Sequence, residues 1–180
     1  MNDLLLLRAL EFAARKHRDQ RRKDEEASPY INHPISVALL LAEKGGVTDT
    51  EVLAAAILHD TLEDTETKPE ELEAAFGVRV RKLVEEVTDD KTLRKEARKQ
   101  LQIEHAEHLS PDAVLIKLGD KIANVLDVTH RPPANWNIDR RREYLDWAKA
   151  VVGNCPRVNG ALENYFAEVL EQGRYKLLSC

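Results

Sequence analysis

Two segments of this 180-residue chain are apolar on almost every side when they are drawn as helices. They are residues 52–58, with the sequence VLAAAIL, and residues 113–128, with the sequence AVLIKLGDKIANVLDV. A helix without a polar face has no side to turn toward water, so other parts of the protein must surround it. Both segments are therefore predicted to be central helices around which the rest of the chain packs.

Amphipathic patterns on both sides of these segments predict further helices. The first helix is expected at residues 3–18, and a second is expected to open at Pro34 and to stop at Gly45-Gly46. Apolar residues at helical spacing are expected to face inward from this second helix: Ile35, Ala38, Leu39 and Ala42. Residues 48–51 and 67–70 match the capping-box pattern, and the helix after the first box is expected to continue through Asp64.

No segment alternates polar and apolar residues in the manner of a strand, so the predicted fold class is all-α. The expected architecture is an irregular multi-helix bundle that forms a single domain over residues 1–180. No stretch of the chain is apolar for the roughly 20 residues that a membrane-spanning helix needs.

Charge and cysteine content narrow the possible partners and compartment. The formal net charge of −5 argues against a general nucleic-acid binder, although a local cationic pocket remains compatible with it. Cys155 and Cys180 are too few and too close to the C-terminus to form a disulfide framework. We therefore expect a cytoplasmic protein without nucleic-acid or membrane partners, present as a monomer or a small homo-oligomer.

Polar side chains interrupt both apolar segments, and these interruptions are the strongest indication of function. His59, Asp60, Glu63 and Asp64 follow the first segment directly, and Asp120 and Asn124 lie four residues apart within the second. Burying such groups is costly unless they are paired or bind a metal ion. The alternative reading of residues 59–64 is an ordinary helix end that faces water.

His33, in the rigid Asn-His-Pro corner, is a third polar residue at a segment expected to pack against the core. Its presence suggests that the polar side chains of the three segments converge on one point. Two imidazoles and two carboxylates suit a divalent ion such as Mn²⁺, Fe²⁺ or Zn²⁺. The candidate ligands are His33, His59, Asp60 and Asp120. Glu63 and Asp64 lie one turn further on and are candidates for orienting a metal-bound water or exchanging protons with it.

Longer motifs around these residues resemble the HD-domain metal phosphohydrolases. The matching segments are residues 30–34 (YINHP), 58–64 (LHDTLED) and 117–124 (KLGDKIAN). The pattern is most similar to the hydrolase domain of the RelA/SpoT homologues, and especially to the short metazoan SpoT-like small alarmone hydrolases. Residues 21–24 (RRKD) and 84–93 (VEEVTDDKTL) strengthen that resemblance, which covers about residues 8 to 150.

The resemblance implies Mn²⁺-dependent hydrolysis of (p)ppGpp, which releases pyrophosphate from the 3′ position and leaves GDP or GTP. It implies that His33, His59, Asp60 and Asp120 hold the metal and that Glu63 and Asp64 activate or position the water. It also implies nucleotide contacts from four further side chains: Arg22, Lys23, Lys95 and Asn124. The chain departs from the usual pattern at Leu126, where relatives carry arginine, and this leaves the substrate preference open.

Two other functions remain compatible with the sequence. One is a phosphatase that acts on another 2′- or 3′-phosphorylated nucleotide, such as NADPH. The other is a catalytically inactive HD domain that binds a nucleotide. Among the remaining candidates, His17 is expected to be a core or rim residue, and Trp136, Tyr144 and Trp147 are expected to be packing residues.

Overall fold

The computed structural model describes residues 3–178, and within this range it contains only helices, turns and loops, apart from one isolated β-bridge between Arg21 and Pro29. The predicted all-α multi-helix bundle is therefore confirmed. No helix among the described residues is both long and apolar enough to cross a membrane. The elements in chain order are α1 (Asp3–Lys16), α2 (Asn32–Glu43), α3 (Thr50–Leu58), α4 (Thr61–Asp64), α5 (Pro69–Phe76), α6 (Val78–Val87), α7 (Lys95–His105), the 3₁₀-helix η1 (Ala106–His108), α8 (Pro111–His130), α9 (Ile138–Asn154) and α10 (Gly160–Leu178).

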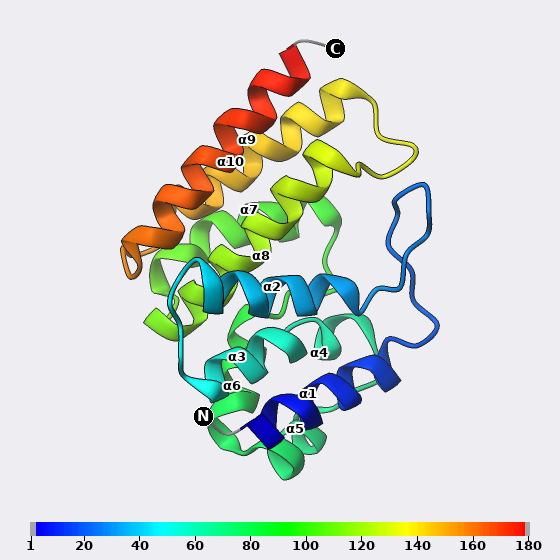
Figure 1. Ribbon diagram of the computed structural model, residues 1–180, viewed down its shortest axis with the longest axis vertical. Coiled ribbons are helices and arrows are strands. Elements are labelled where there is room, and N and C mark those ends of the chain that lie inside the picture. The colour runs from blue at the N-terminus through cyan, green and yellow to red at the C-terminus, as the bar shows by residue number, and fades with distance from the viewer. Residues whose placement is uncertain (1–2, 179–180) are drawn as a thin grey trace.

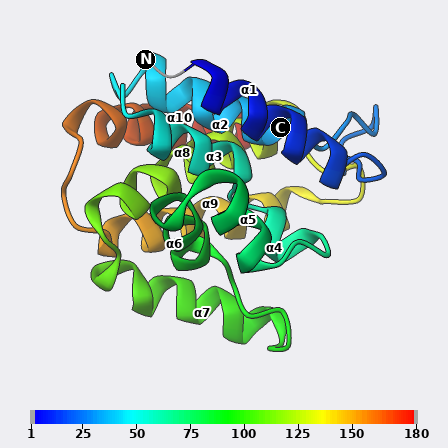
Figure 2. The same ribbon diagram turned by 90° about the horizontal axis from the view of Figure 1, so that it is seen from below.

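The two predicted central helices correspond to α3 and α8. Helix α3 packs against α1, α2, α6 and α8, whereas α8 also packs against α2, α9 and α10. In Figure 1, α8, α9 and α10 run side by side at one end of the molecule, and α2 lies between them and the group formed by α1, α3 and α5. Figure 2 shows α7 at the outer edge, where it contacts α9.

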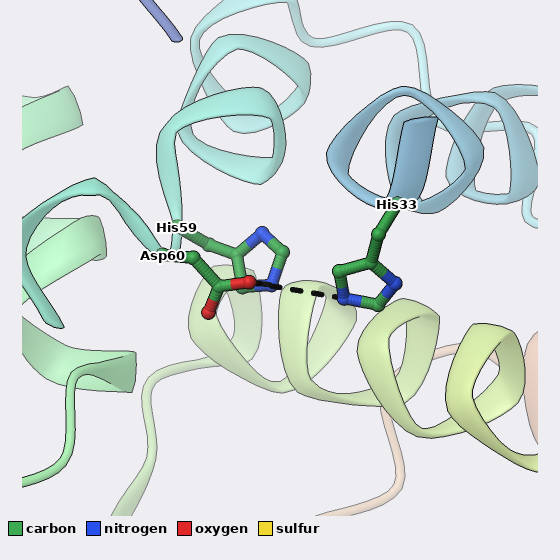
Figure 3. A group of neighbouring side chains, drawn as sticks. All are labelled: His33, His59 and Asp60. Atoms are coloured by element: carbon green, nitrogen blue, oxygen red, sulfur yellow. Dashed lines mark ion pairs between the residues drawn. The ribbon is translucent and has the colours of Figure 1, made fainter. Parts of the chain in front are cut away.

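The helix that begins at Thr50 does not continue as one helix through its polar end. It stops at Leu58, His59 and Asp60 form a turn, and α4 begins at Thr61. The Thr61 hydroxyl donates a hydrogen bond of 2.6 Å to the Leu58 carbonyl, one of the acceptors that the end of a helix leaves free. The turn presents the side chains of His59 and Asp60 toward His33 on α2 (Figure 3).

The expected inward face of α2 is wrong. Three of the four residues predicted to face inward are exposed, including Ile35 and Leu39 at 41% and 52% exposure. Val37 and Leu41 are fully buried instead, and they share one face with His33 because the three residues follow a spacing of four. Since α2 is apolar on nearly all sides, its periodicity did not determine which side faces the core.

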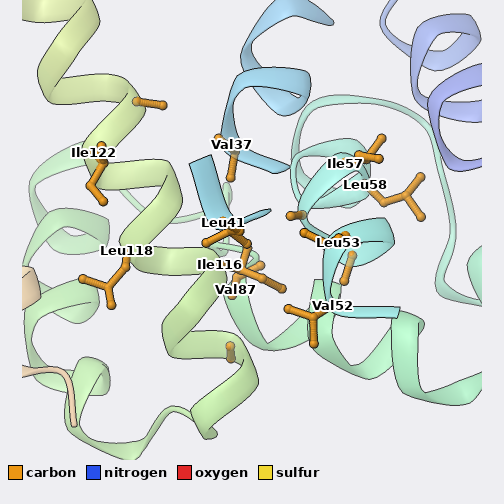
Figure 4. Packing of buried hydrophobic residues seen from close by; sticks show 14 of the residues in the cluster. Val37, Leu41, Val52, Leu53, Ile57, Leu58, Val87, Ile116, Leu118 and Ile122 are labelled. Carbon is orange, nitrogen blue, oxygen red and sulfur yellow. The ribbon is translucent and has the colours of Figure 1, made fainter. Parts of the chain in front are cut away.

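The hydrophobic core surrounds α3. All seven residues from 52 to 58 are buried, as expected for a central helix. Figure 4 shows their neighbours from α2, α6 and α8, including Leu41, Val87 and Ile116. Burial of this kind stabilises a fold by roughly 25 cal/mol for each Å² of apolar surface removed from water.

The observed helix caps differ from the predicted capping boxes. Asp49 caps α3 by accepting the amide protons of residues 51 and 52, so the cap lies one residue after the predicted Thr48. No side chain caps α5, which begins with Pro69 directly after Lys68. Both helices nevertheless begin within two residues of the predicted boxes.

Gly173 marks a close approach of α10 to α8, and this yields a stability prediction. A Cβ at position 173 would lie 2.6 Å from the Thr129 hydroxyl. Helix propensity alone favours alanine over glycine by about 1 kcal/mol, but overpacking costs about 1 to 3 kcal/mol. We therefore expect Gly173→Ala to lower the free energy of unfolding measured in urea.

The matched control is Gly153→Ala in α9, where a Cβ would meet nothing within 4 Å. This change is expected to raise the free energy of unfolding by up to about 1 kcal/mol. If both variants gain stability equally, α8 and α10 do not approach as closely as described.

Candidate metal centre and catalytic site

Four side chains that are distant in sequence meet where α2, α3 and α8 converge. His33 belongs to the first turn of α2, His59 and Asp60 to the turn after α3, and Asp120 to the middle of α8. The Nε2 atom of His33 lies 3.1 Å from Asp120 Oδ1 and 3.8 Å from Asp60 Oδ2. The Nε2 atom of His59 lies 3.1 Å from Asp60 Oδ2 and 3.8 Å from Asp120 Oδ1. The fold thus brings the four predicted ligands to one point.

These side chains have the chemistry of a site for a divalent ion. Ligand atoms of His33, His59 and Asp60 all lie within 4.8 Å of one another (Figure 3). The Nδ1 atom of His59 lies 2.8 Å from the Ala56 carbonyl, which fixes the proton on that nitrogen. The opposite nitrogen, Nε2, is buried without a hydrogen-bond partner and faces the carboxylates. A buried lone pair directed at anions is unfavourable unless a proton or a metal ion lies between them, so these residues fit a metal ion that replaces the proton.

The charges of the cluster are strongly coupled to one another. Burial opposes a charge on His59, but the neighbouring Asp60 and Asp120 carboxylates outweigh it and raise the pKa of His59 to about 10. Burial likewise opposes the charge on Asp60, yet the two imidazoles hold its pKa below the usual range. A divalent ion therefore competes with protons for this cluster, and its binding releases protons.

Three polar side chains hold the two carboxylates in place. The Tyr30 hydroxyl donates a hydrogen bond of 2.7 Å to Asp60 Oδ2. The Lys121 ammonium lies 3.0 Å from Asp120 Oδ2, and the Asn124 amide donates to Asp120 Oδ1 at 2.5 Å. Asn124 was predicted from the resemblance to contact substrate, whereas Tyr30 and Lys121 received no role. A lysine next to an aspartate inside an apolar helix was a usable signal, because a buried ammonium needs an anionic partner.

Glu63 extends from α4 into the cavity that contains the four clustered side chains. Its Oε2 atom accepts the Asp89 amide proton at 3.2 Å, and Arg98 lies 3.5 Å from Oε1. Burial raises the pKa of Glu63 to about 7, with further contributions from the negative charges of Asp89 and Asp60. A carboxylate with a pKa near neutrality is well suited to accept a proton from water.

Asp64 lies on the same short helix but in a more open environment. It forms an ion pair with Lys91 and lines both the cavity over the cluster and the larger cavity beside it. The two carboxylates predicted to act on water therefore lie in different surroundings, and Glu63 is the more buried of the two.

Two adjoining cavities occupy the space in front of the cluster. The smaller one, of about 210 Å³, is lined by the four clustered side chains and by Glu63. The larger one, of about 480 Å³, shares Arg22, Asp64 and Asn124 with it and is also lined by the exposed Lys23. The pair of cavities leads from the clustered carboxylates to a cationic surface.

Arg22 is held by protein groups at the boundary of the two cavities. Its guanidinium donates to Asp127 Oδ2 at 2.5 Å and to Asn124 Oδ1 at 3.3 Å, and it lies over the Tyr30 ring at 5.6 Å. Asp127 was not singled out from the sequence, although it follows Asn124 by three residues and therefore lies on the same side of α8.

Lys95 lies apart from Arg22 and Lys23. It is exposed at the first position of α7 and lines a third cavity of about 270 Å³. This cavity shares Trp136 and Tyr144 with the cavity of about 480 Å³, so the two aromatic rings expected to be packing residues also form cavity walls. Their ring centroids lie 5.7 Å apart.

The remaining sequence candidates lie outside the cluster. His17 is 2% exposed, and its Nδ1 atom lies 2.6 Å from Gln20 Oε1, which confirms the core placement. Leu126 is partly buried against the hydrophobic core. Cys155 is a free cysteine, whereas Cys180 lies outside the described residues.

Comparison with known proteins identifies the family. The model of the HD domain matches residues 9–146, which include all four clustered side chains and Glu63. The chain belongs to the HD-domain family. This assignment confirms the predicted resemblance and agrees with the observed helical fold.

Curated and solved relatives resemble this HD domain over nearly its whole length. It is 53% identical over 167 residues to the human protein named guanosine-3′,5′-bis(diphosphate) 3′-pyrophosphohydrolase MESH1, with 93% of each chain covered. It is 55% identical to the Xenopus tropicalis protein of the same name, over 88% of this chain and 89% of the relative. A solved structure described as a metazoan ortholog of SpoT that hydrolyzes ppGpp superposes with a TM-score of 0.90 at 46% identity, covering 93% and 94% of the two chains.

The raised pKa of Glu63 yields a prediction for the metal-free protein. We expect its carboxyl carbon, followed by ¹³C NMR, to titrate near pH 7, above the ordinary value of 4.5. Because the carboxylate is the form that accepts a proton, its population rises as the pH rises through that value. Added Zn²⁺, which is diamagnetic and leaves the signal observable, is expected to lower the pKa, since a nearby cation disfavours the protonated form.

The Glu63→Gln variant serves to assign the signal, because it should lack that titration. Observation of an ordinary midpoint near 4.5 would contradict the burial of Glu63 described above.

Proposed function

We propose that this chain is a metal-dependent (p)ppGpp 3′-pyrophosphohydrolase, which converts ppGpp or pppGpp to GDP or GTP and pyrophosphate. The observation that carries the proposal is the identity of about half of all residues, across nearly the whole length, to relatives that bear this activity in their names. The clustered imidazoles and carboxylates supply the chemistry that such a reaction needs.

In this proposal His33, His59, Asp60 and Asp120 hold one divalent ion. Mn²⁺ is the proposed ion, with Zn²⁺ or Fe²⁺ as alternatives, because a mixed imidazole and carboxylate set accepts all three. Such an ion acidifies a bound water molecule and neutralises charge on a phosphoryl group. The unpartnered Nε2 atom of His59 supports its assignment as a ligand.

Glu63 is the proposed general base, and Asp64 helps to position the water. Glu63 takes the proton from the water that attacks the phosphorus attached to the 3′ oxygen. The bond between that phosphorus and the 3′ oxygen breaks, the proton held by Glu63 passes to the 3′ oxygen through solvent to form a hydroxyl, and the hydroxylated diphosphate group is released as pyrophosphate. The desolvated environment of Glu63 supports this role, because it places the pKa close to the pH at which the enzyme would work.

The cationic side of the two cavities is the proposed nucleotide site. Arg22 and Lys23 contact the phosphates, and Asn124 lies near the ribose or the 3′-phosphates while also supporting Asp120. Lys95 reaches the phosphates from the neighbouring cavity. A local group of cations attracts a polyanion at contact distance, although the whole chain is acidic.

The wider setting follows from the same proposal. We propose a cytoplasmic enzyme in which residues 1–180 form one domain, present as a monomer or a small homo-oligomer. The isolated free Cys155 is compatible with a reducing compartment.

Two substitutions separate metal binding from catalysis. Asp60→Ala removes a proposed ligand, so we expect loss of both Mn²⁺ binding in calorimetry and ppGpp hydrolysis. Glu63→Gln keeps the proposed ligands, so we expect Mn²⁺ binding to persist while kcat falls by about 10²- to 10⁴-fold, the usual contribution of general acid–base catalysis. Full Mn²⁺-dependent activity of Asp60→Ala would show that the assigned site is wrong.

A substrate panel tests the reaction itself. The protein is incubated with Mn²⁺ and either ppGpp, pppGpp or NADPH, and released pyrophosphate and phosphate are measured, with EDTA as the control. We expect pyrophosphate from ppGpp and pppGpp. Turnover of NADPH alone would favour a phosphatase of another phosphorylated nucleotide, and ppGpp binding without turnover would favour an inactive nucleotide-binding domain.

The cationic pocket is tested by Lys23→Ala. Loss of one phosphate contact is expected to raise KM for ppGpp by about tenfold, corresponding to about 1.4 kcal/mol of binding. Lys68→Ala removes another exposed lysine, one that lines neither cavity of the site, and it should leave KM unchanged. Equal effects of the two variants would refute a specific role for Lys23.

A further inference from the structure

Lys121 is a buried lysine to which the mechanism above gives no part. It follows Asp120 on α8 and is only 3% exposed. Its Nζ atom lies 3.0 Å from Asp120 Oδ2. A buried ammonium of this kind is costly without an anionic partner, and Asp120 supplies that partner.

The Lys121 ammonium also lies over an aromatic ring. Its Nζ atom lies 4.4 Å from the centre of the Trp147 ring on α9. The indole nitrogen of Trp147 donates a hydrogen bond of 3.0 Å to the Lys99 carbonyl on α7, so the ring is itself anchored. The ammonium therefore contacts both a carboxylate oxygen and an aromatic face, which is a favourable environment for a cation.

This arrangement divides the two oxygens of Asp120 between different partners. Oδ1 faces the imidazoles of His33 and His59 and accepts a hydrogen bond from Asn124. Oδ2 is directed to Lys121. A carboxylate can bind a cation through one oxygen or through both. With Lys121 in place, Oδ2 is engaged by the ammonium, and Oδ1 is the oxygen that faces the other proposed ligands.

We propose that Lys121 is a positioning residue with two effects. It limits Asp120 to a single bond with the divalent ion, and it reduces the negative charge that Asp120 presents to that ion. This inference rests on the metal site proposed above. By occupying Oδ2, Lys121 keeps a coordination position available for water or a substrate oxygen. By sharing the carboxylate charge, it leaves the ion more strongly polarising. The same positive charge repels the ion, so Lys121 does not serve to tighten metal binding.

The proposal predicts that removing the Lys121 ammonium affects metal affinity and turnover in opposite directions. Removing a residue with a purely supporting role would not. Removing the Lys121 ammonium frees Oδ2 and removes a repulsive charge, so the ion should bind at least as tightly as before. The freed oxygen occupies a position needed for the reaction, so turnover should fall. A residue that merely held the site together would weaken both when removed.

The test uses Lys121→Met, with Co²⁺ alone as the spectroscopic probe. We expect calorimetric Co²⁺ affinity to be equal to or greater than that of the parent protein. The visible absorption of bound Co²⁺ should change, because a second Asp120 oxygen joins its coordination. The kcat for ppGpp should fall by about 10- to 100-fold, the usual effect of removing a group that orients a metal ligand.

Thermal unfolding provides a readout that does not depend on activity. Without metal, Lys121→Met leaves Asp120 as an anion with a missing partner, so its Tm should fall. Added Co²⁺ should raise the Tm of Lys121→Met by more than that of the parent, because the ion replaces the lost cation.

Three further variants complete the design. Lys121→Arg keeps the charge and should restore the parental Co²⁺ spectrum and most of kcat. Lys121→Gln keeps a hydrogen-bond donor without the charge, and its kcat should lie between those of the parent and Lys121→Met. If Lys121→Met does not fold, Lys121→Gln provides the test of the proposal. Lys117→Met removes the other buried lysine of α8, whose ammonium bonds to the Val87 carbonyl at 3.2 Å, and it should leave the Co²⁺ spectrum unchanged.

The outcomes separate this inference from the proposed function. If Co²⁺ affinity falls together with kcat in Lys121→Met and Lys121→Gln, or if the spectrum and kcat are unaffected, the role assigned to Lys121 is refuted while the enzyme assignment stands. A parent protein that binds no Co²⁺ refutes the metal site and this inference together. A parent that binds Co²⁺ without hydrolysing ppGpp refutes the proposed function alone.

Discussion

The structure depends on a balance of charges at one buried point, where α2, α3 and α8 meet. Two carboxylates face two imidazoles there, at the edge of the hydrophobic core, and further polar side chains support them. Each of these charges is costly to bury alone, so their stability depends on their mutual positions. The three helices are consequently linked by electrostatics as well as by packing, and the cavities lie directly above this link.

The surroundings of the carboxyl groups near that point shift their pKa values in opposite directions. The imidazoles keep the pKa of Asp60 low, whereas burial and neighbouring anions raise the pKa of Glu63 to about 7. Carboxyl groups whose environments separate their pKa values in this way commonly divide the work of a site between them. Here, Asp60 stays ionised and is suited to face a cation, whereas Glu63 is suited to exchange a proton.

The features that could be predicted from the sequence are those that leave a local chemical contradiction. A histidine and an aspartate at the end of a wholly apolar segment are such a contradiction, and so is Asp120 within α8. The features that were missed depend on which side of a helix faces the core and on where the chain changes direction. The inward face of α2 was wrong because that helix is apolar all round, and the break after Leu58 was missed because residues 59–64 keep the helical spacing of charged groups. Contacts between distant elements, such as Arg22 with Asp127, have no counterpart in local patterns.

The pairing of Arg22 with Asp127 has a consequence for ligand selection. The guanidinium already has an anionic partner at 2.5 Å, so under the proposed function a ligand phosphate competes with Asp127 for Arg22. A ligand with a single weak charge gains little from that exchange, whereas a diphosphate offers more acceptors and a higher charge density. Under the proposed function, Asp127 therefore lowers the net gain from binding a phosphate at Arg22, which favours ligands of high charge density over weakly charged ones.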